Sequence, residues 1–325
     1  MRAVVYSRYG TADDLRLEQV AEPRPRNGDV LIRVRAASVN SWDWDLVRGV
    51  PWMSRVTAPV RPKFRILGAD VAGVVAAVGG GVTRFRVGDA VFGDLAESGW
   101  GGFAEFATAR ETALLPKPGR LTFAEAASVP QAGCLAWQAI VQAGRLAAGE
   151  RILIIGAGSG VGTFGIQLAK SRAHVTAVDR RSKLDRLAGL GADRVVDFAE
   201  HDPLAVPGGF DLIVDVVARR PVLAYRRALA PGGRLVVVGG RTRTIFATGT
   251  WGALLSIGGR RRMRMLLARA NRGLPELADL LQTGELVPVV DSIWPLEAVP
   301  DAIRTLAAAD AFGKLVIDVA DANER

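Results

Sequence analysis

The sequence has few residues of the kinds that bind transition metals or form disulfides. Its 325 residues include one cysteine, Cys134, and two histidines, His174 and His201. A single cysteine excludes internal disulfides and a structural zinc site built from four cysteines of one chain. A catalytic zinc ion normally takes three protein ligands, drawn mainly from His and Cys. We therefore expect no zinc, and a protein that works in a reducing compartment.

Long apolar runs are also missing. No stretch reaches the ~20 apolar residues that a membrane-spanning helix needs, and residues 1–6 resemble an opening strand rather than a signal peptide. The chain is 49% hydrophobic and 23% charged, which is typical of a globular protein of about two domains. We expect a cytoplasmic protein with no membrane partner.

Lysine is rare, yet the net charge is +9. The excess comes from arginines dispersed along the chain, and residues 260–264, Arg-Arg-Arg-Met-Arg, form a basic cluster. The cluster is not interleaved with aromatic residues and matches no nucleic-acid-binding module. We interpret it as a solvated strand edge or a subunit contact, and expect no nucleic-acid partner.

The most informative stretch is residues 151–162, Arg-Ile-Leu-Ile-Ile-Gly-Ala-Gly-Ser-Gly-Val-Gly. It predicts a buried strand, a glycine-rich turn and the start of a helix. The spacing does not fit G-x-G-x-x-G, but mostly small residues let the backbone approach a diphosphate at a helix N-terminus. We predict a dinucleotide phosphate site formed by Gly156, Ala157, Gly158, Ser159, Gly160, Val161 and Gly162.

The choice of dinucleotide depends on the residues that end the next predicted strand. Asp179 is suited to accept hydrogen bonds from the ribose of NAD and to repel a 2′-phosphate. Arg180, Arg181 and Lys183 follow it, and these cations favour the 2′-phosphate of NADP. Asp179 is also suited to cap the next helix. The residues themselves leave NAD and NADP both open.

The hydrophobic pattern changes near residue 123. Residues 1–122 contain many short strands separated by Pro and Gly, which predicts a β-barrel-like domain, and the tail after residue 285 has the same character. Between them apolar strands alternate with helices, which indicates a doubly wound parallel sheet and an α/β protein. The predicted strands are 151–155, 174–178, 195–198, 211–216, 234–239 and 262–268.

Six segments taken in order resemble one family. They are residues 37–43, 67–73, 86–92, 102–106, 156–162 and 313–317. Together they resemble the medium-chain dehydrogenase/reductase superfamily, and within it the zinc-free quinone oxidoreductase branch, which includes NAD(P)-dependent alcohol dehydrogenase-like proteins. The resemblance implies a GroES-like barrel of residues 1–122 completed by 285–325, a Rossmann domain of residues 123–284, an active site in the cleft and a homodimer.

The same resemblance implies that zinc is absent. Zinc enzymes of the superfamily carry Cys where this chain has Asn40, Gly-His-Glu where it has residues 68–70, Gly-Ala-Asp, and a third ligand where it has Gln131. All three metal-binding positions are therefore replaced. This agrees with the small number of His and Cys residues.

The resemblance also assigns site residues. It implies that Asn40 and Asp43 lie near the nicotinamide, and that Val238, Gly239 and Gly240 pass close to its carboxamide. Without a metal, charge on a reacting oxygen must be met by hydrogen-bond donors, so we predict Asn40, or a water ordered by Asp43, as catalytic. We find no strong proton donor, which suits a quinone because solvent can protonate its reduced form.

Four tryptophans, Trp42, Trp44, Trp52 and Trp100, fall in predicted loops that border the cleft. They form either core packing or flat walls for a planar conjugated substrate. The expected function is NADPH- or NADH-dependent reduction of quinones or other α,β-unsaturated carbonyls. The alternatives are an alcohol dehydrogenase or enoyl-thioester reductase, and a non-catalytic dinucleotide sensor or nucleic-acid-binding protein.

Overall fold

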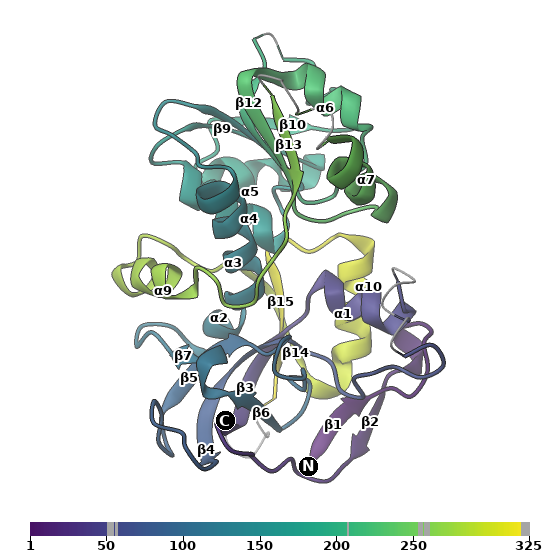
Figure 1. Ribbon diagram of the computed structural model, residues 1–325, viewed down its shortest axis with the longest axis vertical. Helices are drawn as coiled ribbons and strands as arrows, with labels where there is room; N and C mark the ends of the chain where they lie inside the picture. Colours follow the sequence, from purple (N-terminus) through teal and green to yellow (C-terminus); the bar gives the residue numbers. More distant parts are fainter. Residues whose placement is uncertain (51–54, 56–57, 207, 253–255, 257–260, 320–325) are drawn as a thin grey trace. The chain divides into compact units, whose positions relative to one another are not determined.

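The chain forms two compact units, shown in a computed structural model (Figure 1). The structure describes residues 1–325 except 51–54, 56–57, 207, 253–255, 257–260 and 320–325. The β-rich unit comprises Met1–Cys134 and Ala270–Arg325, and the α/β unit comprises Leu135–Arg269. No helix among the described residues is long and apolar enough to cross a membrane.

The β-rich unit is organised around β3 (Asp29–Ser38), a long strand of mostly buried residues. It pairs antiparallel with β4 (Asp70–Val78), β6 (Phe106–Arg110) and β15 (Lys314–Asp318). The sheet order within the described residues is β14-β15-β3-β4-β5-β7, and β1 and β2 form a separate pair. The remaining strands are β1 (Arg2–Val5), β2 (Arg16–Gln19), β5 (Ala90–Asp94), β7 (Leu115–Pro116) and β14 (Val290–Pro295).

The C-terminal segment completes this sheet, as its strand-like composition predicts. In the register of β15 against β3, Val316 is opposite Ser38 and Ile317 is opposite Ala37. The two segments share one apolar core, which buries Ile32, Val71, Val91, Ile303, Leu315 and Ile317 among others. Burial of apolar area in such a core is the main favourable term in folding.

The β-rich unit also contains helices. The helix α2 (Phe123–Ala127) begins at a capping box in which Thr122 and Glu125 each accept the other's backbone N–H. The helix α1 (Ser41–Arg48) occupies residues that we expected to form a loop, so Trp42 and Trp44 are helical. The other helices are α3 (Pro130–Trp137), which crosses into the second unit, α9 (Leu274–Thr283) and α10 (Val299–Ala308).

The α/β unit is a parallel sheet in the order β10-β9-β8-β11-β12-β13. The prediction of a doubly wound parallel sheet is therefore confirmed. Its strands are β8 (Arg151–Ile155), β9 (His174–Asp179), β10 (Arg194–Asp197), β11 (Phe210–Asp215), β12 (Leu229–Val237) and β13 (Arg262–Met265). Its helices are α4 (Gly160–Ala169), α5 (Leu184–Gly189), α6 (Val222–Ala228) and α7 (Thr242–Ala247).

Helices pack on both faces of this sheet, which explains why its strands are apolar without alternation. Figure 1 shows α4 and α5 to one side of the strands and α6 and α7 to the other. The side chains of Ile155, Val178, Tyr225 and Leu235 belong to one buried cluster. The order of the strands reverses between β8 and β11, where α/β sheets commonly bind nucleotides.

The division between the units differs from the one expected at residues 123 and 285. It falls after Cys134 and before Ala270, because the flanking residues are bonded to the β-rich unit. Gln131 N donates to Asp70 Oδ1 (2.9 Å), and Asn271 exchanges hydrogen bonds with the Asp94 backbone (2.8 Å each). A change from strand to helix periodicity therefore does not mark the boundary.

Candidate functional site

The glycine-rich turn lies between β8 and α4, as predicted. Gly156 adopts a left-handed φ of 80°, a conformation that glycine takes at little cost. Ser159 caps α4, because its Oγ accepts from Gly162 N (3.2 Å) while donating to Gly156 O (2.7 Å). Ser159 thus stabilises the turn.

Two backbone donors remain available at the start of α4. Among the described residues, the N–H groups of Gly160 and Val161 have no hydrogen-bond partner. A Cβ on Gly162 would lie 2.4 Å from Ala157 O, so only glycine lets the helix approach the turn this closely. Unpaired N–H groups at a helix N-terminus are the usual partners of a diphosphate. The turn therefore fits a dinucleotide.

Asp179, at the end of β9, holds this turn in place. Its Oδ2 accepts from Gly158 N and its Oδ1 accepts from Arg180 N, both at 2.8 Å. Lys183 Nζ lies 3.9 Å from Oδ1, and both side chains are largely buried. The Lys183 ammonium therefore partly offsets the charge of Asp179. Asp179 does not cap the following helix, which has no side-chain cap.

The exposed cations beside Asp179 are arginines. Arg180 and Arg181 are exposed, and Arg181 lies 3.8 Å from the exposed Glu200. An ion pair this exposed contributes little stability. Both guanidinium groups are thus accessible at the adenosine end of the predicted dinucleotide site.

The third predicted cofactor segment reaches the same edge of the sheet. Val238 N donates to Asp215 O (2.8 Å), which places residues 238–240 after β12 and next to the end of β11. A Cβ on Gly240 would lie 2.2 Å from Val217 O, and one on Gly156 would lie 3.1 Å from the Val217 side chain. The structure thus brings the glycine turn and Gly240 to the two sides of Val217, at the carboxyl ends of the strands.

In the β-rich unit, Asp43 is the residue that organises α1. Its Oδ2 accepts from Asn40 N (2.7 Å), which is one half of a capping box, and its Oδ1 accepts from Gly68 N (2.9 Å). The side chain has no exposed surface. Burial raises the pKa of Asp43 to about 7, although the two backbone N–H groups act in the opposite direction. Asp43 therefore positions Asn40 rather than facing solvent.

Asn40 belongs to a buried network centred on Asp70. Asp70 Oδ2 accepts from Ser38 Oγ (2.9 Å), Asn40 Nδ2 (3.0 Å) and Lys314 Nζ (3.4 Å). Lys314 Nζ also donates to Asn40 Oδ1 (2.5 Å) and Val39 O (3.1 Å). We call the set Ser38, Asn40, Asp70, Gln131 and Lys314 the Asp70 cluster.

Charge in this region is concentrated and poorly solvated. Asp70 is fully buried and Lys314 is 4% exposed. Desolvation lowers the pKa of Lys314, against the attraction of Asp70 and Asp43. Desolvation likewise raises the pKa of the nearby Asp94, and the charge of Asp70 adds to the effect. Buried charges need a nearby partner of opposite sign. Lys314 is such a partner for the carboxylates of Asp70, Asp43 and Asp94.

Gln131 contributes an unusual group to the cluster. Its backbone N–H binds Asp70, yet its side-chain Nε2 is buried and has no hydrogen-bond partner among the described residues. A buried amide N–H without an acceptor costs stability. Such a group is typical of a site whose acceptor is a ligand.

The tryptophans divide into packing and exposed residues. Trp100 is buried and lies edge-on to Trp42, with ring centroids 5.9 Å apart. Trp44 packs on the core, and Arg48 lies over its ring at 4.7 Å. Trp42 is half exposed and is the most exposed of these three. Trp52 lies outside the described residues.

The other side chains that could take part in catalysis lie outside the Asp70 cluster and the glycine turn. His174 and His201 are exposed in the α/β unit. Tyr225 is buried and donates to Asp215 Oδ2 (2.6 Å), while Tyr6 is buried close enough to Asp43 for its pKa to be raised by that charge as well as by burial. Within the described residues, no group of three or more His, Cys, Asp and Glu side chains is arranged to hold a metal ion.

Sequence reasoning grouped Asn40, Asp70 and Gln131 as replaced metal-binding positions, but it missed Lys314 and the hydrogen bonds that Asp70 makes. A signal existed for both, because Lys314 opens an apolar strand and Asp70 precedes another. A charged residue in a buried strand predicts a buried partner. Nothing in the sequence identifies which partner it is.

Comparison with known proteins agrees with this arrangement. Residues 26–119 match the model of the alcohol dehydrogenase GroES-like domain, and residues 190–317 match that of a zinc-binding dehydrogenase family. A quinone-oxidoreductase homolog from Spinacia oleracea is 33% identical over 332 residues, covering 98% of each chain. The chain belongs to the medium-chain dehydrogenase/reductase superfamily.

Within this superfamily the chain falls in the quinone oxidoreductase-like branch. An NADPH-dependent alkenal/one oxidoreductase from Arabidopsis thaliana is 30% identical, covering 98% of this chain and 79% of the relative. The solved structure of the quinone oxidoreductase from Coxiella burnetii aligns with a TM-score of 0.89 and 28% identity, covering 98% of this chain and 99% of that one. The resemblance found in the six sequence segments is thus confirmed.

We predict that the Lys314–Asp70 pair behaves as one energetic unit. Lys314→Met should lower the free energy of unfolding by about 3 kcal/mol or more, because it leaves the Asp70 carboxylate buried without its cation. Lys314→Met/Asp70→Asn should recover a large part of that loss, since both charges are then removed. Urea denaturation of the single and double variants measures the coupling. Additive losses in the double variant would contradict it.

Proposed function

We propose that this protein is a zinc-independent, NAD(P)H-dependent reductase of quinones or other α,β-unsaturated carbonyl compounds. The names of its relatives, a quinone oxidoreductase homolog and an alkenal/one oxidoreductase, support this substrate class. The observation that carries the proposal is the Asp70 cluster, in which the buried ammonium of Lys314 donates to Asn40 and Asp70. The sequence resemblance implies that related enzymes bind zinc at these two positions.

The chemistry of the cluster argues against a metal. Lys314 Nζ donates to both Asn40 and Asp70, so these oxygens already face a positive charge. A divalent cation placed among them would be repelled by the ammonium. We propose that Lys314, together with the loss of the Cys and His ligands, makes the site zinc-free.

The α/β unit supplies the cofactor site. We propose that the N–H groups of Gly160 and Val161 hold the diphosphate and that residues 238–240 line the nicotinamide end. The reduced nicotinamide supplies the hydride when it is bound. Gly162 keeps the helix start close to the turn, so that its backbone reaches the phosphates.

Two amide side chains of the β-rich unit are the proposed donors to the substrate oxygen. Gln131 Nε2 is unpartnered within the described residues, and Asn40 Nδ2 makes only a long second contact, 3.4 Å to Ser38 O. Fixed donors of this kind stabilise charge that develops on a carbonyl oxygen. Asp43 holds Asn40 in position, and Trp42 offers a flat apolar ring to a planar conjugated substrate.

For the cofactor we propose NADPH over NADH. Asp179 is held by Gly158 N and Arg180 N and lies beside Lys183, so its repulsion of a 2′-phosphate is reduced. Arg180 and Arg181 are exposed next to it and are suited to bind that phosphate. A cytoplasmic location and a homodimer stay predictions.

Turnover of a substrate panel tests the activity. The purified protein should oxidise NADPH with quinones or enones, and a metal chelator should leave the rate unchanged. Gly162→Ala should abolish turnover, because its Cβ would lie 2.4 Å from Ala157 O, whereas Gly189→Ala, with no atom within 4 Å, should retain it. Chelator-sensitive alcohol oxidation, or tight cofactor binding with no turnover of any compound, would contradict the proposal.

The proposed role of Gln131 as a hydrogen-bond donor can be tested separately from its effect on stability. Gln131→Met should lower kcat for a quinone by roughly 100-fold, as expected when one donor to a developing oxyanion is lost. The melting temperature should not fall, because an unpaired buried amide is removed. Gln142→Met, an exposed glutamine of the α/β unit, is the control. Unchanged kcat in Gln131→Met would exclude the donor role.

Cofactor choice is tested by two substitutions with different expected outcomes. Arg181→Ser should weaken NADPH binding about tenfold or more and leave NADH binding nearly unchanged, because one arginine–phosphate contact is lost. Asp179→Ser should weaken both dinucleotides, since it releases Gly158 and Lys183. Dissociation constants for NADPH and NADH, measured by fluorescence titration, test both expectations. An Asp179→Ser variant that only shifts the NADP/NAD ratio would show that Asp179 acts by repulsion.

A further inference from the structure

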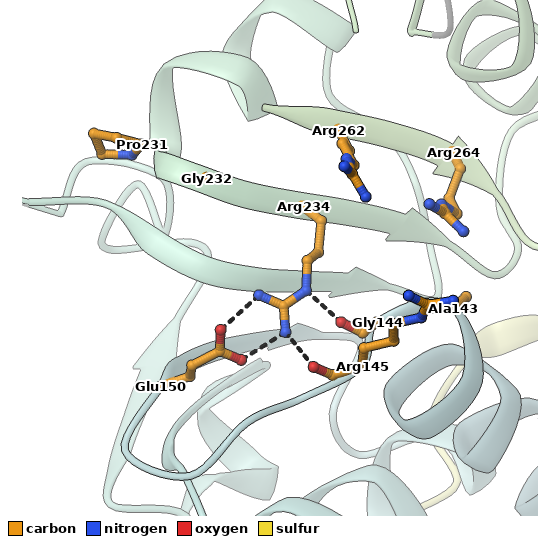
Figure 2. A pocket seen from close by; sticks show the side chains of 9 residues that line it. All are labelled: Ala143, Gly144, Arg145, Glu150, Pro231, Gly232, Arg234, Arg262 and Arg264. Carbon is orange, nitrogen blue, oxygen red and sulfur yellow. Dashed lines mark hydrogen bonds and ion pairs between the residues drawn. The ribbon is translucent and has the colours of Figure 1, made fainter. Parts of the chain in front are cut away.

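A second concave site lies in the α/β unit, at the edge of the sheet opposite the glycine turn. It has a volume of about 760 Å³ and lies near the amino ends of β12 and β13 (Figure 2). We call it the arginine pocket. It is lined by Ala143, Gly144, Arg145, Glu150, Pro231, Gly232, Arg234, Arg262 and Arg264.

One of its four arginines is a structural element. Arg234 binds both carboxylate oxygens of Glu150, at 2.7 and 2.6 Å, and donates to the backbone carbonyls of Gly144, Arg145 and Asp211. Figure 2 shows the bonds from Arg234 to Glu150, Gly144 and Arg145 as dashed lines. The Arg234 guanidinium also lowers the pKa of Glu150. The single acid of the lining is therefore ionised and already paired.

The other three arginines are not neutralised by described residues. Within the described part of the chain, the side chains of Arg145, Arg262 and Arg264 have no hydrogen-bond or ion-pair partner, and all three residues are exposed. Arg262 and Arg264 are two residues apart on β13, so they project from the same face of the strand. In Figure 2 both side chains point toward the side where Arg234 binds Glu150. After the Arg234–Glu150 pair is discounted, the lining carries three positive charges.

The backbone fixes one of these cations. Arg145 adopts a left-handed φ of 48°, which is uncommon for a residue with a side chain. Its carbonyl accepts from Arg234 Nη2 at 2.7 Å. The same arginine that neutralises Glu150 therefore also holds Arg145 at the rim.

We propose that the arginine pocket binds a small ligand that carries two or more phosphate groups. Its volume lies within the range of small-molecule sites, and guanidinium groups are the side chains best suited to bind phosphate oxygens in pairs. The ligand's phosphates bridge β13 to the turn at Arg145. This site is separate from the dinucleotide site, because the glycine turn follows β8, whereas Glu150 precedes that strand and Arg262 opens β13.

A nucleic acid fits the lining less well than a small polyphosphate. Single-stranded nucleic acid is usually held by aromatic platforms in addition to cations, and none of the nine lining residues is aromatic. The cations also converge on a bounded pocket instead of following a groove. Recognition here depends on phosphate groups alone.

Calorimetric titration of the full chain with sodium tripolyphosphate tests the proposal. Arg262→Gln/Arg264→Gln should weaken binding at least about tenfold, since two charge-assisted contacts are lost. The control is Arg172→Gln/Arg194→Gln, which removes two exposed arginines of the same unit outside the pocket and should bind like the wild type. Because both variants keep the glycine turn, tripolyphosphate bound there contributes equally to each titration.

Three results would overturn the assignment. The first is equal affinity in the two double variants. The second is binding of orthophosphate as tight as that of tripolyphosphate, which would exclude recognition of several phosphates together. The third is tighter binding of an RNA oligonucleotide than of tripolyphosphate at equal phosphate concentration, which would make the pocket part of a nucleic-acid surface. Melting temperatures within a few degrees of wild type establish that the variants are folded.

Discussion

The fully buried carboxylate of Asp70 is the constraint on which the β-rich unit depends. It accepts hydrogen bonds from Ser38, Asn40, Gln131 and Lys314, residues that belong to β3, the start of α1, α3 and β15. A charge so far from water is tolerated only if every partner is present. The cluster therefore ties the C-terminal strand to the N-terminal sheet, and it fixes the amides that we propose as donors.

We propose two phosphate-binding sites for the α/β unit. After β8, glycines and the N–H groups of Gly160 and Val161, which have no hydrogen-bond partner among the described residues, form the candidate dinucleotide site. In the arginine pocket, Arg262 and Arg264 of β13 share the lining with the paired Arg234 and Glu150. At the glycine turn, backbone N–H groups are the proposed phosphate donors. In the arginine pocket, long cationic side chains have this role.

Much of the fold could be predicted from the sequence. β8 occupies residues 151–155 as predicted, and the strands of the α/β unit form the predicted parallel sheet. The helix α1 was missed because its residues alternate Trp and Asp without an apolar stripe, and its N-terminus is fixed by Asp43. The unit boundary was misplaced since hydrogen bonds from Gln131 and Asn271, not periodicity, hold those segments to the β-rich unit.

By itself the sequence determined the fold class, the place of the glycine turn and the replacement of metal ligands, because these depend on local spacing and residue type. Only the tertiary structure decided what the polar residues do. Asp179 holds the turn through Gly158, and Lys314 meets Asp70 across 244 positions of sequence. Partners of buried charges are chosen by strand register and burial, and pairing of this kind leaves no periodic signal in the chain.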